Sequence, residues 1–453
     1  MNKKQLFIIL FFSTFAVIGQ NISGAVLDAE TNAPIENATV YFKKENSGTV
    51  TDDKGRFELK IPSKINPSDT IRFSIIGYAP KNYSFSKLEE LHFIIHLSKQ
   101  TENLKEVTVT SKRELNPRIS FKKLSPLVRG VYDFGSVLIN GKIYVIGGDE
   151  SYYDDKAMRV FTNVASTSES KFKDLINGTR ANFYWGNYNS NLQVYDIEKD
   201  TWTISKLKFQ ERAYHNINYF DGKIYVLGGK TLSTNRQMEY LDDKIEVLDL
   251  NTNQIITDNA NPHQAVNFAS FTYQDNIIVM GGSIKQPRKG KKVYSDKSHI
   301  YNITSGFWYE LPKMNEPKEA NGIIVNNKIY LIGGFHDVPL LEIESYDLSA
   351  GKWNNEGDLF DRMENPALTF YDNTIYIFDD GNILTYNIES KILNEYDIDL
   401  KLKDARMHCY KNDLYILGGF TEEDYTIEPS PNVYSIDLTE FYKTKIINSK
   451  KVN

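Results

Sequence analysis

Short segments in which hydrophobic and polar residues alternate recur through most of the chain, and several of them share one sequence. The phrase Lys-Ile-Tyr-[Val/Leu]-[Ile/Leu]-Gly-Gly occurs at residues 142–148, 223–229 and 328–334. Weaker copies lie at residues 277–282, 375–380 and 414–419. A unit that recurs six times, roughly every 40 to 80 residues, predicts a repeat architecture.

Each unit contains the same predicted strands in the same order. In the first unit, a hydrophobic run at residues 136–139 passes through Asn140-Gly141 into the alternating run, and the glycine pair follows. Glycine reaches the positive backbone angles that let the chain turn sharply out of a sheet. After a loop come a strand at residues 194–197 and an aromatic strand that carries Trp202. Four short strands separated by turns are the content of one β-propeller blade.

The units resemble kelch repeats, and the resemblance rests on four residues of the first unit: Gly147, Gly148, Tyr195 and Trp202. It covers residues 119–450 and implies an all-β fold with a six-bladed kelch-type β-propeller. The fifth unit departs from the pattern, because Asp379-Asp380-Gly381 replaces the glycine pair and the tryptophan is absent. We therefore expect a reshaped turn in the fifth blade.

The ends of the propeller also have predicted positions. Residues 119–127 resemble the outer strand that ends other units, such as residues 201–207. We therefore expect them to complete the sixth blade beside residues 433–438, which would join the two ends of the ring. Residues 441–446 are the competing segment for that edge.

A separate domain precedes the propeller, over residues 20–98. Its alternating segments predict a small β-sandwich with a hairpin turn at Asp52-Asp53-Lys54-Gly55. The stretch resembles the carboxypeptidase regulatory-like domain, a prealbumin-like sandwich, at these residues: Gly24, Pro34, Ala38, 49–52, Gly55, Phe57 and 74–78. The domain serves either as a docking module or as a spacer without a ligand.

Residues 99–118 are predicted to link the sandwich to the propeller. Within them, residues 104–110 are similar to the segment that ends this domain in TonB-dependent outer-membrane receptors. That similarity implies the cell envelope of a Gram-negative bacterium. It does not imply transport, because a propeller stands here in place of the plug and barrel of those receptors.

The N-terminal segment has the pattern of a secretory signal peptide over residues 1–19. Lys3 and Lys4 precede an apolar stretch from Leu6 to Ile18, and the small residue Gly19 follows. We expect an exported protein, in the periplasm, associated with the outer membrane, or extracellular. No later apolar run is long enough to span a membrane, so outer-membrane association would come through a partner.

The composition limits the classes of partner. The chain has 453 residues, of which 41% are hydrophobic and 25% charged, as in ordinary globular proteins. Its formal net charge of -6 makes nucleic acid an unexpected partner. Cys409 is the single cysteine, so no internal disulfide can form. The histidines lack the spacing of metal ligands, and we predict neither a metal site nor a cofactor.

The strand order within a blade determines which loops share a face. In an antiparallel blade, the loop after each glycine pair lies beside the start of the first strand. Long insertions follow Gly148, Gly229 and Gly282, so they crowd one edge, which we call the loop-bearing rim. Because rigid scaffolds present functional loops, this rim is the predicted binding face. Tyr184 and Trp185 of the first insertion either stack against a ligand or pack the loop onto its own blade.

Polar residues recur at the starts of the first strands. Asparagines stand at nearly the same place in four units and predict a ring of amides at the mouth of the central channel: Asn216, Asn267, Asn321 and Asn365. These amides either bind ligand hydroxyls or satisfy backbone groups and ordered water. His215 and His408 are the remaining predicted ligand contacts.

Two functions of different classes fit these patterns. The first is an envelope protein whose propeller rim binds a glycan or protein partner, with the sandwich as spacer or docking module. The second is an enzyme, because the architecture is similar to the periplasmic N-acetylneuraminate epimerases (mutarotases). That chemistry needs a carboxylate and a cation that converge on a sugar acid in a pocket of small-sugar size. The candidates for this catalytic pair are Glu319, Glu364, Arg212, Arg362 and Arg406.

Overall fold

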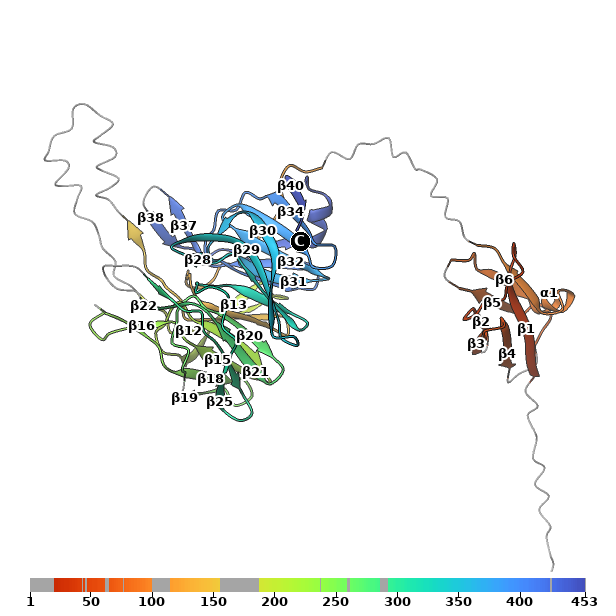
Figure 1. Ribbon diagram of the computed structural model, residues 1–453, viewed down its shortest axis with the longest axis horizontal. Coiled ribbons are helices and arrows are strands. Elements are labelled where there is room, and N and C mark those ends of the chain that lie inside the picture. The colour runs from red at the N-terminus through yellow and green to blue at the C-terminus, as the bar shows by residue number, and fades with distance from the viewer. Residues whose placement is uncertain are drawn as a thin grey trace, which may run out of the picture. The chain divides into compact units, whose positions relative to one another are not determined.

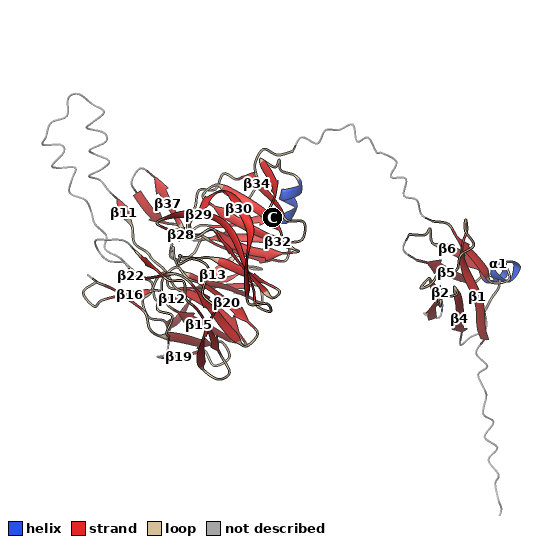
Figure 2. Cartoon of the chain, in the orientation of Figure 1, coloured by secondary structure: helices blue, strands red, loops and turns tan. Residues whose placement is uncertain are grey.

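A computed structural model of the chain describes most of its residues in two compact units. The described residues are 20–42, 44, 47–61, 65–75, 77–99, 115–154, 187–236, 238–258, 261–285, 292–423 and 426–452. The units divide between Lys112 and Arg113, which lies within the linker expected at residues 99–118. Strands dominate both units (Figure 2). The predicted signal peptide, residues 1–19, lies outside the described residues.

The N-terminal unit is a sandwich of two sheets, as the sequence predicts. One sheet has the order β4-β1-β7, from Arg56–Ile61, Gln20–Asp28 and Ile94–Leu97. The other has the order β3-β2-β5-β6, from Ser47–Val50, Thr39–Phe42, Thr70–Ser74 and Lys81–Ser84. The short helix α1, Phe85–Glu90, follows β6. The alternating side chains of both sheets meet in one core that includes Val40, Leu59 and Phe73, all fully buried.

Among the described residues, the C-terminal unit contains six sheets of four or five strands, each of which is one propeller blade, and three smaller sheets (Figure 1). Blade one consists of β9 (Gly135–Ile139), β10 (Lys142–Ile146), β12 (Asn191–Asp196) and β13 (Thr201–Lys208). Blade two consists of β14 (Asn216–Phe220), β15 (Lys223–Leu227), β18 (Ile245–Asp249) and β19 (Gln254–Asp258). Blade three consists of β20 (Ala269–Tyr273), β21 (Asn276–Met280), β24 (Ser298–Asn302) and β25 (Phe307–Leu311).

The second half of the propeller has two blades with additional or distant strands. Blade four consists of β26 (Gly322–Val325), β27 (Lys328–Ile332), β29 (Val338–Asp347) and β30 (Lys352–Met363). Blade five consists of β31 (Ala367–Tyr371), β32 (Thr374–Asp379), β33 (Asn382–Asn387), β34 (Ile392–Asp397) and the outermost β40 (Asn448–Lys451). Blade six consists of β35 (Arg406–Tyr410), β36 (Asp413–Leu417), β39 (Val433–Asp437) and β8 (Lys122–Lys123).

Strand β8 confirms the predicted pairing at the sixth blade. It lies beside β39, with Lys123 opposite Tyr434 and Lys122 opposite Ser435. The competing segment goes elsewhere, because its start lies in a 3₁₀ helix at Leu438–Tyr442 and the chain then continues to β40 of blade five. The first strands of blades six and one also meet, where the Ser136 hydroxyl lies 2.9 Å from Nε2 of His408.

One hydrogen bond between neighbouring blades repeats around the ring. The N–H group of the second residue of each glycine pair donates to a carbonyl that stands four residues before the next first strand. The lengths are 2.8–3.0 Å for the six pairs: Gly148–Arg212, Gly229–Ala265, Gly282–Lys318, Gly334–Met363, Asp380–Leu402 and Gly419–Val131. The last bond runs from blade six back to blade one. Blade five takes part through Asp380, although it lacks the glycine pair.

The loops that follow the glycine pairs form short hairpins on one side of the propeller, where Figure 1 labels β16, β22, β28, β37 and β38. In blades two and three they are β16 (Lys230–Leu232) with β17 (Glu239–Leu241), and β22 (Ser283–Lys285) with β23 (Val293–Tyr294). In blade four, β28 (Phe335–His336) pairs with β29. In blades six and one, β37 (Phe420–Glu423) pairs with β38 (Thr426–Pro429), and β38 pairs with β11 (Tyr153–Asp154). These positions confirm the predicted loop-bearing rim.

Blade five has only a two-residue turn at that rim, which confirms the expected departure. Strand β32 ends at Asp379, strand β33 begins at Asn382, and the two residues pair with each other. Asp380 and Gly381 form the turn with φ of 35° and 94°. The chain therefore returns at once into the sheet and presents no hairpin to the rim.

The glycine pairs generate a prediction about stability. Gly229 and Gly306 both have positive φ, of 79° and 72°. A β-carbon at Gly229 would overlap the carbonyl oxygen of Ala213 and lie 2.7 Å from the β-carbon of His215, whereas at Gly306 it would meet nothing within 4 Å. Gly306→Ala should therefore cost only the backbone strain of about 1–2 kcal/mol. Gly229→Ala should lower the free energy of unfolding by about 1–3 kcal/mol more, through overpacking. Chemical denaturation of both variants measures the difference, and equal losses of unfolding free energy would contradict the tight packing at Gly229.

Candidate functional site

A pocket opens on the loop-bearing rim at the place where blade five lacks a hairpin. Its volume is about 480 Å³. Pro339, from the hairpin of blade four, and Phe420, from that of blade six, stand among its lining residues. The remaining lining residues come from the ends of blade four, the turn of blade five and the start of blade six: Asp361, Arg362, Met363, Glu364, Asn365, Asp379, Asp380, Asn382, Lys403 and Asp404. We call this cavity the blade-five pocket.

The blade-five pocket is acidic. Five of its lining residues are aspartate or glutamate, and two are arginine or lysine. Both cations are already engaged, because Lys403 forms an ion pair of 2.6 Å with Glu422 and Arg362 donates to the carbonyl of Pro339 at 2.9 Å. Within the part of the chain that the structure describes, no hydrogen bond or ion pair holds the carboxylates of Asp361, Glu364 and Asp379. The pocket therefore presents unpaired acceptors.

Burial and mutual repulsion raise the pKa values of three carboxyl groups in the pocket, those of Asp379, Glu364 and Asp404. Burial, followed by the charges of Asp404 and Asp380, raises the pKa of Asp379 to about 7. The pKa of Glu364 is raised by burial and then by Asp404, against the attraction of Lys292 and Lys403. The pKa of Asp404 is raised by burial, against the attraction of Arg406 and a hydrogen bond from Asn365. Asp379 therefore carries a proton part of the time near neutral pH.

Asp133 of blade one interacts electrostatically with Asp404 of the pocket. Its residue is only 4% exposed, and burial followed by the charge of Asp404 raises its pKa well above the usual range. Its backbone carbonyl accepts a hydrogen bond from the N–H of Tyr214 in the next blade. Asp133 and Asp404 occupy the same place in their units, two residues before β9 and β35. The first and last blades thus contribute equivalent carboxyl groups that repel each other when charged.

Below the mouth, a second cavity of about 260 Å³ lies along the central channel. All six first strands or the residues just before them contribute polar lining groups: Ser136, Asn216, Ser270, Asn321, Thr369, Arg406 and His408. Asn216 donates to the carbonyl of Phe268, and Asn321 donates to that of Pro366 at 2.8 Å. The asparagine ring was predicted either to bind ligand hydroxyls or to satisfy backbone groups and ordered water. These two contacts favour the second alternative. Burial lowers the pKa of His408 to about 4, so its imidazole is neutral at pH 7.

The structure brings some predicted site residues together and separates others. Glu364, Arg362 and Asn365 line the blade-five pocket, while Asn216, Asn321, Arg406 and His408 line the channel. Glu319 is 3% exposed and is held by Ser283 at 2.6 Å, Lys292 at 3.1 Å and Asn267 at 3.2 Å. Tyr184 and Trp185 lie outside the described residues.

Two predicted site residues need correction. Arg212 is fully buried, and its guanidinium forms ion pairs of 2.8 Å with both Asp242 and Glu246. It holds blade two together and offers no surface to a ligand at the mouth. His215 is 1% exposed, and burial lowers its pKa well below the usual range. It packs against Gly135, Gly147 and Gly229 where blades one and two meet, so it too is a packing residue.

The residues that sequence reasoning missed are Asp133, Asp379, Lys403 and Asp404. The replacement of the glycine pair by Asp379-Asp380 was the available signal, because an unusual residue at a repeated position marks a local difference in structure. Aspartate at one equivalent position in the first and sixth units was a second signal. Neither signal shows that the side chains meet across three blades.

The histidines and the cysteine form no metal centre among the described residues. No group of three histidine, cysteine, aspartate or glutamate side chains stands in reach of one metal ion in that part of the chain. His263 and His299 pair through their Nδ1 atoms at 2.9 Å, and burial lowers the pKa of His263 to about 4. Cys409 is half-buried and free, and burial raises its pKa to about 11.

No helix of the described residues is long and apolar enough to span a membrane.

Comparisons with known proteins agree with the two units. The family model of the CarboxypepD_reg-like domain matches residues 22–109, and that of the Kelch motif matches residues 319–359. The chain thus carries a CarboxypepD_reg-like domain followed by kelch repeats, and such domains support a protein-binding role.

Several curated kelch proteins are similar to the propeller. Kelch repeat and BTB domain-containing protein 12 of Homo sapiens is 27% identical over 175 residues, which are 36% of this chain and 28% of the relative. Spermatocyte protein spe-26 of Caenorhabditis elegans is 25% identical, over 37% of this chain and 29% of its own length. Kelch repeat and BTB domain-containing protein 1 of Vaccinia virus (strain Copenhagen) is 23% identical, over 51% and 42%. The chain therefore spans less than half the length of these relatives.

The raised pKa of Asp379 generates a prediction about pH and stability. The folded state keeps this proton up to about pH 7, whereas an unfolded aspartate releases it near 3.8. Because the folded state binds more protons in this window, the contribution of Asp379 to stability is lost as the pH rises from about 4 to 7. Asp379→Asn should therefore raise the free energy of unfolding at pH 8 by about 1–2 kcal/mol and change it little at pH 4. Asp372→Asn, in an exposed turn at the other rim, is the control. The free energy of unfolding is measured for Asp379→Asn and wild type at several pH values between 4 and 8. A difference between the two that stays the same at every pH would contradict the raised pKa of Asp379.

Proposed function

We propose that this protein is an envelope binding protein whose propeller captures a partner at the loop-bearing rim, with the sandwich domain as spacer or docking module. The sequence leaves open a glycan or a protein as that partner. The acidic, partly apolar pocket and the surrounding hairpins favour a protein. Kelch repeats and a CarboxypepD_reg-like domain support protein binding in general, without identifying the partner.

The observation that carries the proposal is the blade-five pocket with its unpaired carboxylates. Buried or half-buried polar groups in folded proteins nearly always have a partner. Asp379 is half-buried and has no protein partner among the described residues, and burial followed by repulsion from Asp404 raises its pKa to about 7. Asp361 and Glu364 are exposed, and they add two more carboxyl groups without a partner among the described residues to the same pocket. Perturbed carboxyl groups in a cleft on a loop-bearing face mark a binding site.

The enzyme alternative requires a cation that holds a sugar acid. Glu364 and Arg362 do line one pocket of suitable size, and the guanidinium of Arg362 keeps its charge while one N–H donates to the carbonyl of Pro339. Five carboxyl groups face two engaged cations there, and Arg212 is buried in ion pairs. An anionic substrate would be repelled by this field. The charge therefore favours binding of a neutral or cationic group over sugar-acid chemistry.

The proposed location is the envelope of a Gram-negative bacterium, on the periplasmic or outer side. The charged start, apolar stretch and small residue of the segment 1–19 support export. The similarity of residues 104–110 to outer-membrane receptors supports the envelope, with the outer membrane reached through a partner.

Export gives a direct test. Expression of the full chain in a Gram-negative host should yield a mature protein whose first residue is at or near Gln20, as read by N-terminal sequencing of the exported fraction. A charge reversal of Lys3 and Lys4 together should leave most of the chain in the cytoplasm. Export of an uncleaved chain would contradict the signal-peptide interpretation.

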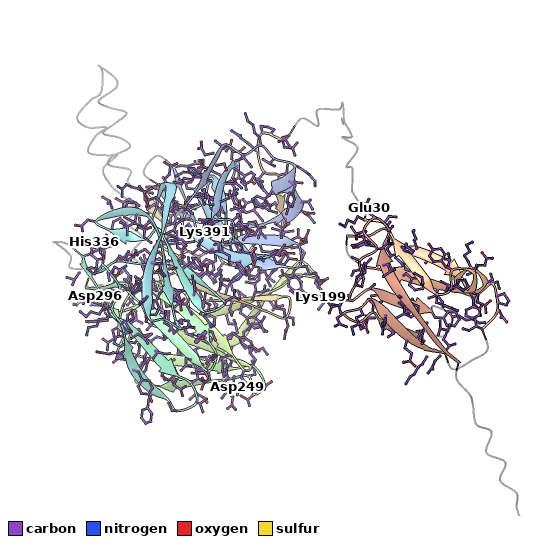
Figure 3. All side chains as sticks on the ribbon, turned by 45° about the vertical axis from the view of Figure 1, so that its right-hand side comes forward. Glu30, Lys199, Asp249, Asp296, His336 and Lys391 are labelled. Atoms are coloured by element: carbon purple, nitrogen blue, oxygen red, sulfur yellow. The ribbon has the colours of Figure 1, made fainter. Side chains whose placement is uncertain are left out.

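The position of the binding face can be mapped by photo-crosslinking. A benzophenone side chain would replace exposed residues on the loop-bearing rim, Tyr240 in β17 and Val338 in β29, which are each 51% exposed. Matched controls at the other rim are Phe307, at the start of β25, and Tyr371, at the end of β31, which are 65% and 41% exposed. In Figure 3, His336 and Asp296 mark the side of the rim, and Lys199 and Asp249 mark turns of the other side. We expect partner adducts from the rim positions alone, and adducts mainly from Phe307 or Tyr371 would overturn the proposed face.

A further inference from the structure

We propose that the blade-five pocket binds the lysine or arginine side chain of a partner protein. This inference deepens the function proposed above and rests on it, because it names the group that the rim recognises. Four properties of the pocket support it: its position, its charge, its apolar wall and the buried carboxyl group of Asp133 that interacts with it.

The position of the pocket suits an inserted side chain. Blades four and six carry hairpins at the rim, whereas blade five has only the turn of Asp380 and Gly381. The cavity of about 480 Å³ is therefore bounded by Pro339 on one hairpin and Phe420 on the other. Phe420 is fixed in place by an edge-on contact with Tyr132, with ring centroids 5.2 Å apart. A single long side chain of a partner can enter between the hairpins while its backbone stays on the rim.

The charge of the pocket selects a cation. Asp361, Glu364 and Asp379 carry no hydrogen bond or ion pair within the described part of the chain. Among the cations around the pocket, Lys403 pairs with Glu422, Lys292 lies 3.1 Å from Glu319, and one N–H of Arg362 donates to the carbonyl of Pro339. The five carboxyl groups of the lining still outnumber its two cationic residues. An ammonium or guanidinium group is the complement of several convergent carboxylates, and its hydrogen bonds to them are charge-assisted.

A buried carboxyl group of blade one interacts electrostatically with the pocket. Asp133 is 96% buried, and no hydrogen bond of its side chain is found among the described residues. Asp404, which lines the pocket, is the charge that acts on it most strongly, and Arg406 is the strongest opposing charge. Arg406 lowers the pKa of both Asp133 and Asp404, but burial outweighs it, so both pKa values stay raised. A cation bound in the pocket would favour the ionised forms of both groups.

The apolar part of the lining distinguishes a protein side chain from a sugar. Pro339, Met363 and Phe420 contribute carbon surface beside the carboxylates. Lysine and arginine have an aliphatic stem that packs on such surface while the charged head reaches polar groups. An amino sugar carries hydroxyl groups around its ring, and those that face this apolar wall would be left without partners.

Binding of a cation should depend on pH through Asp379. The charged groups that face Asp379 are Asp380 on its own turn, Asp404 and Lys403 before β35, and Glu364 before β31. Protonation of Asp379 below about pH 7 removes negative charge from the pocket, so it weakens attraction for a cation. Affinity should therefore rise between pH 6 and pH 8.

The test measures the affinity of small probes for the full mature chain by calorimetry or NMR titration. The probes are the N-acetyl methylamides of lysine, arginine and norleucine, with D-glucosamine as the sugar cation. The lysine and arginine probes should bind at least tenfold more tightly than norleucine, which has the stem without the charge. In the double variant Glu364→Gln with Asp379→Asn their affinity should fall at least tenfold. The matched control, Asp372→Asn with Glu389→Gln, removes the same charge from the other rim and should bind like wild type.

Three results would overturn the inference: equal binding of norleucine, unchanged affinity of the pocket variant, or tighter binding of glucosamine than of the lysine probe. Absence of binding by every probe would overturn it as well. Its failure is separable from that of the proposed function, because the crosslinks at Tyr240 and Val338 report the rim without depending on the pocket. Thermal unfolding of both double variants verifies that each is folded, and Glu364→Gln alone is the milder variant if the double one is not.

Discussion

The propeller depends on one repeated contact, the hydrogen bond from the end of one blade to the approach of the next. Its donor is the second residue of each glycine pair, and its acceptor lies four residues before a first strand. This bond needs a positive φ at the donor and a close approach of two backbones, which glycine permits and larger residues resist. Six such bonds bring every first strand to the same depth around the channel. The Gly-Gly repeat in the sequence therefore reflects a backbone constraint and not a catalytic or binding role.

Blade five shows which part of this constraint is essential. Asp380 keeps the bond to Leu402 at 3.0 Å and keeps a positive φ, while Gly381 supplies the second left-handed position of the turn. The blade therefore stays in the ring although its glycine pair is lost. What disappears is the hairpin, because the chain returns directly into β33. The blade-five pocket is the consequence, since the hairpins of the two neighbouring blades rise on either side of a vacant position.

The sequence was sufficient for properties that depend on local pattern. The alternating runs and glycine pairs predicted six blades, the shared rim and the strand at residues 119–127, because each follows from short-range geometry. The site was less predictable. Arg212 does stand just before a first strand, as the sequence indicates, but its side chain turns into blade two and forms ion pairs with Asp242 and Glu246. Asp379 and Asp404 were overlooked, because their meeting depends on the packing of different blades and no spacing in the chain reports it.

The acidic pocket is better explained by recognition than by stability. A turn that only had to end β32 would need Asp380 and Gly381, whereas the unpaired carboxyl groups of Asp379 and Glu364 weaken the folded state when they are charged. Folded proteins usually pair or neutralise such groups, and the exceptions gather at sites where a ligand supplies the missing charge. Here the two nearby lysines form ion pairs with Glu422 and Glu319, although both also attract the charge of Glu364. Because no described residue of the chain pairs with Asp379 or Glu364, a partner with a cationic tip is the complement that the pocket favours, and the carbon surface of Met363 and Phe420 suits an aliphatic stem.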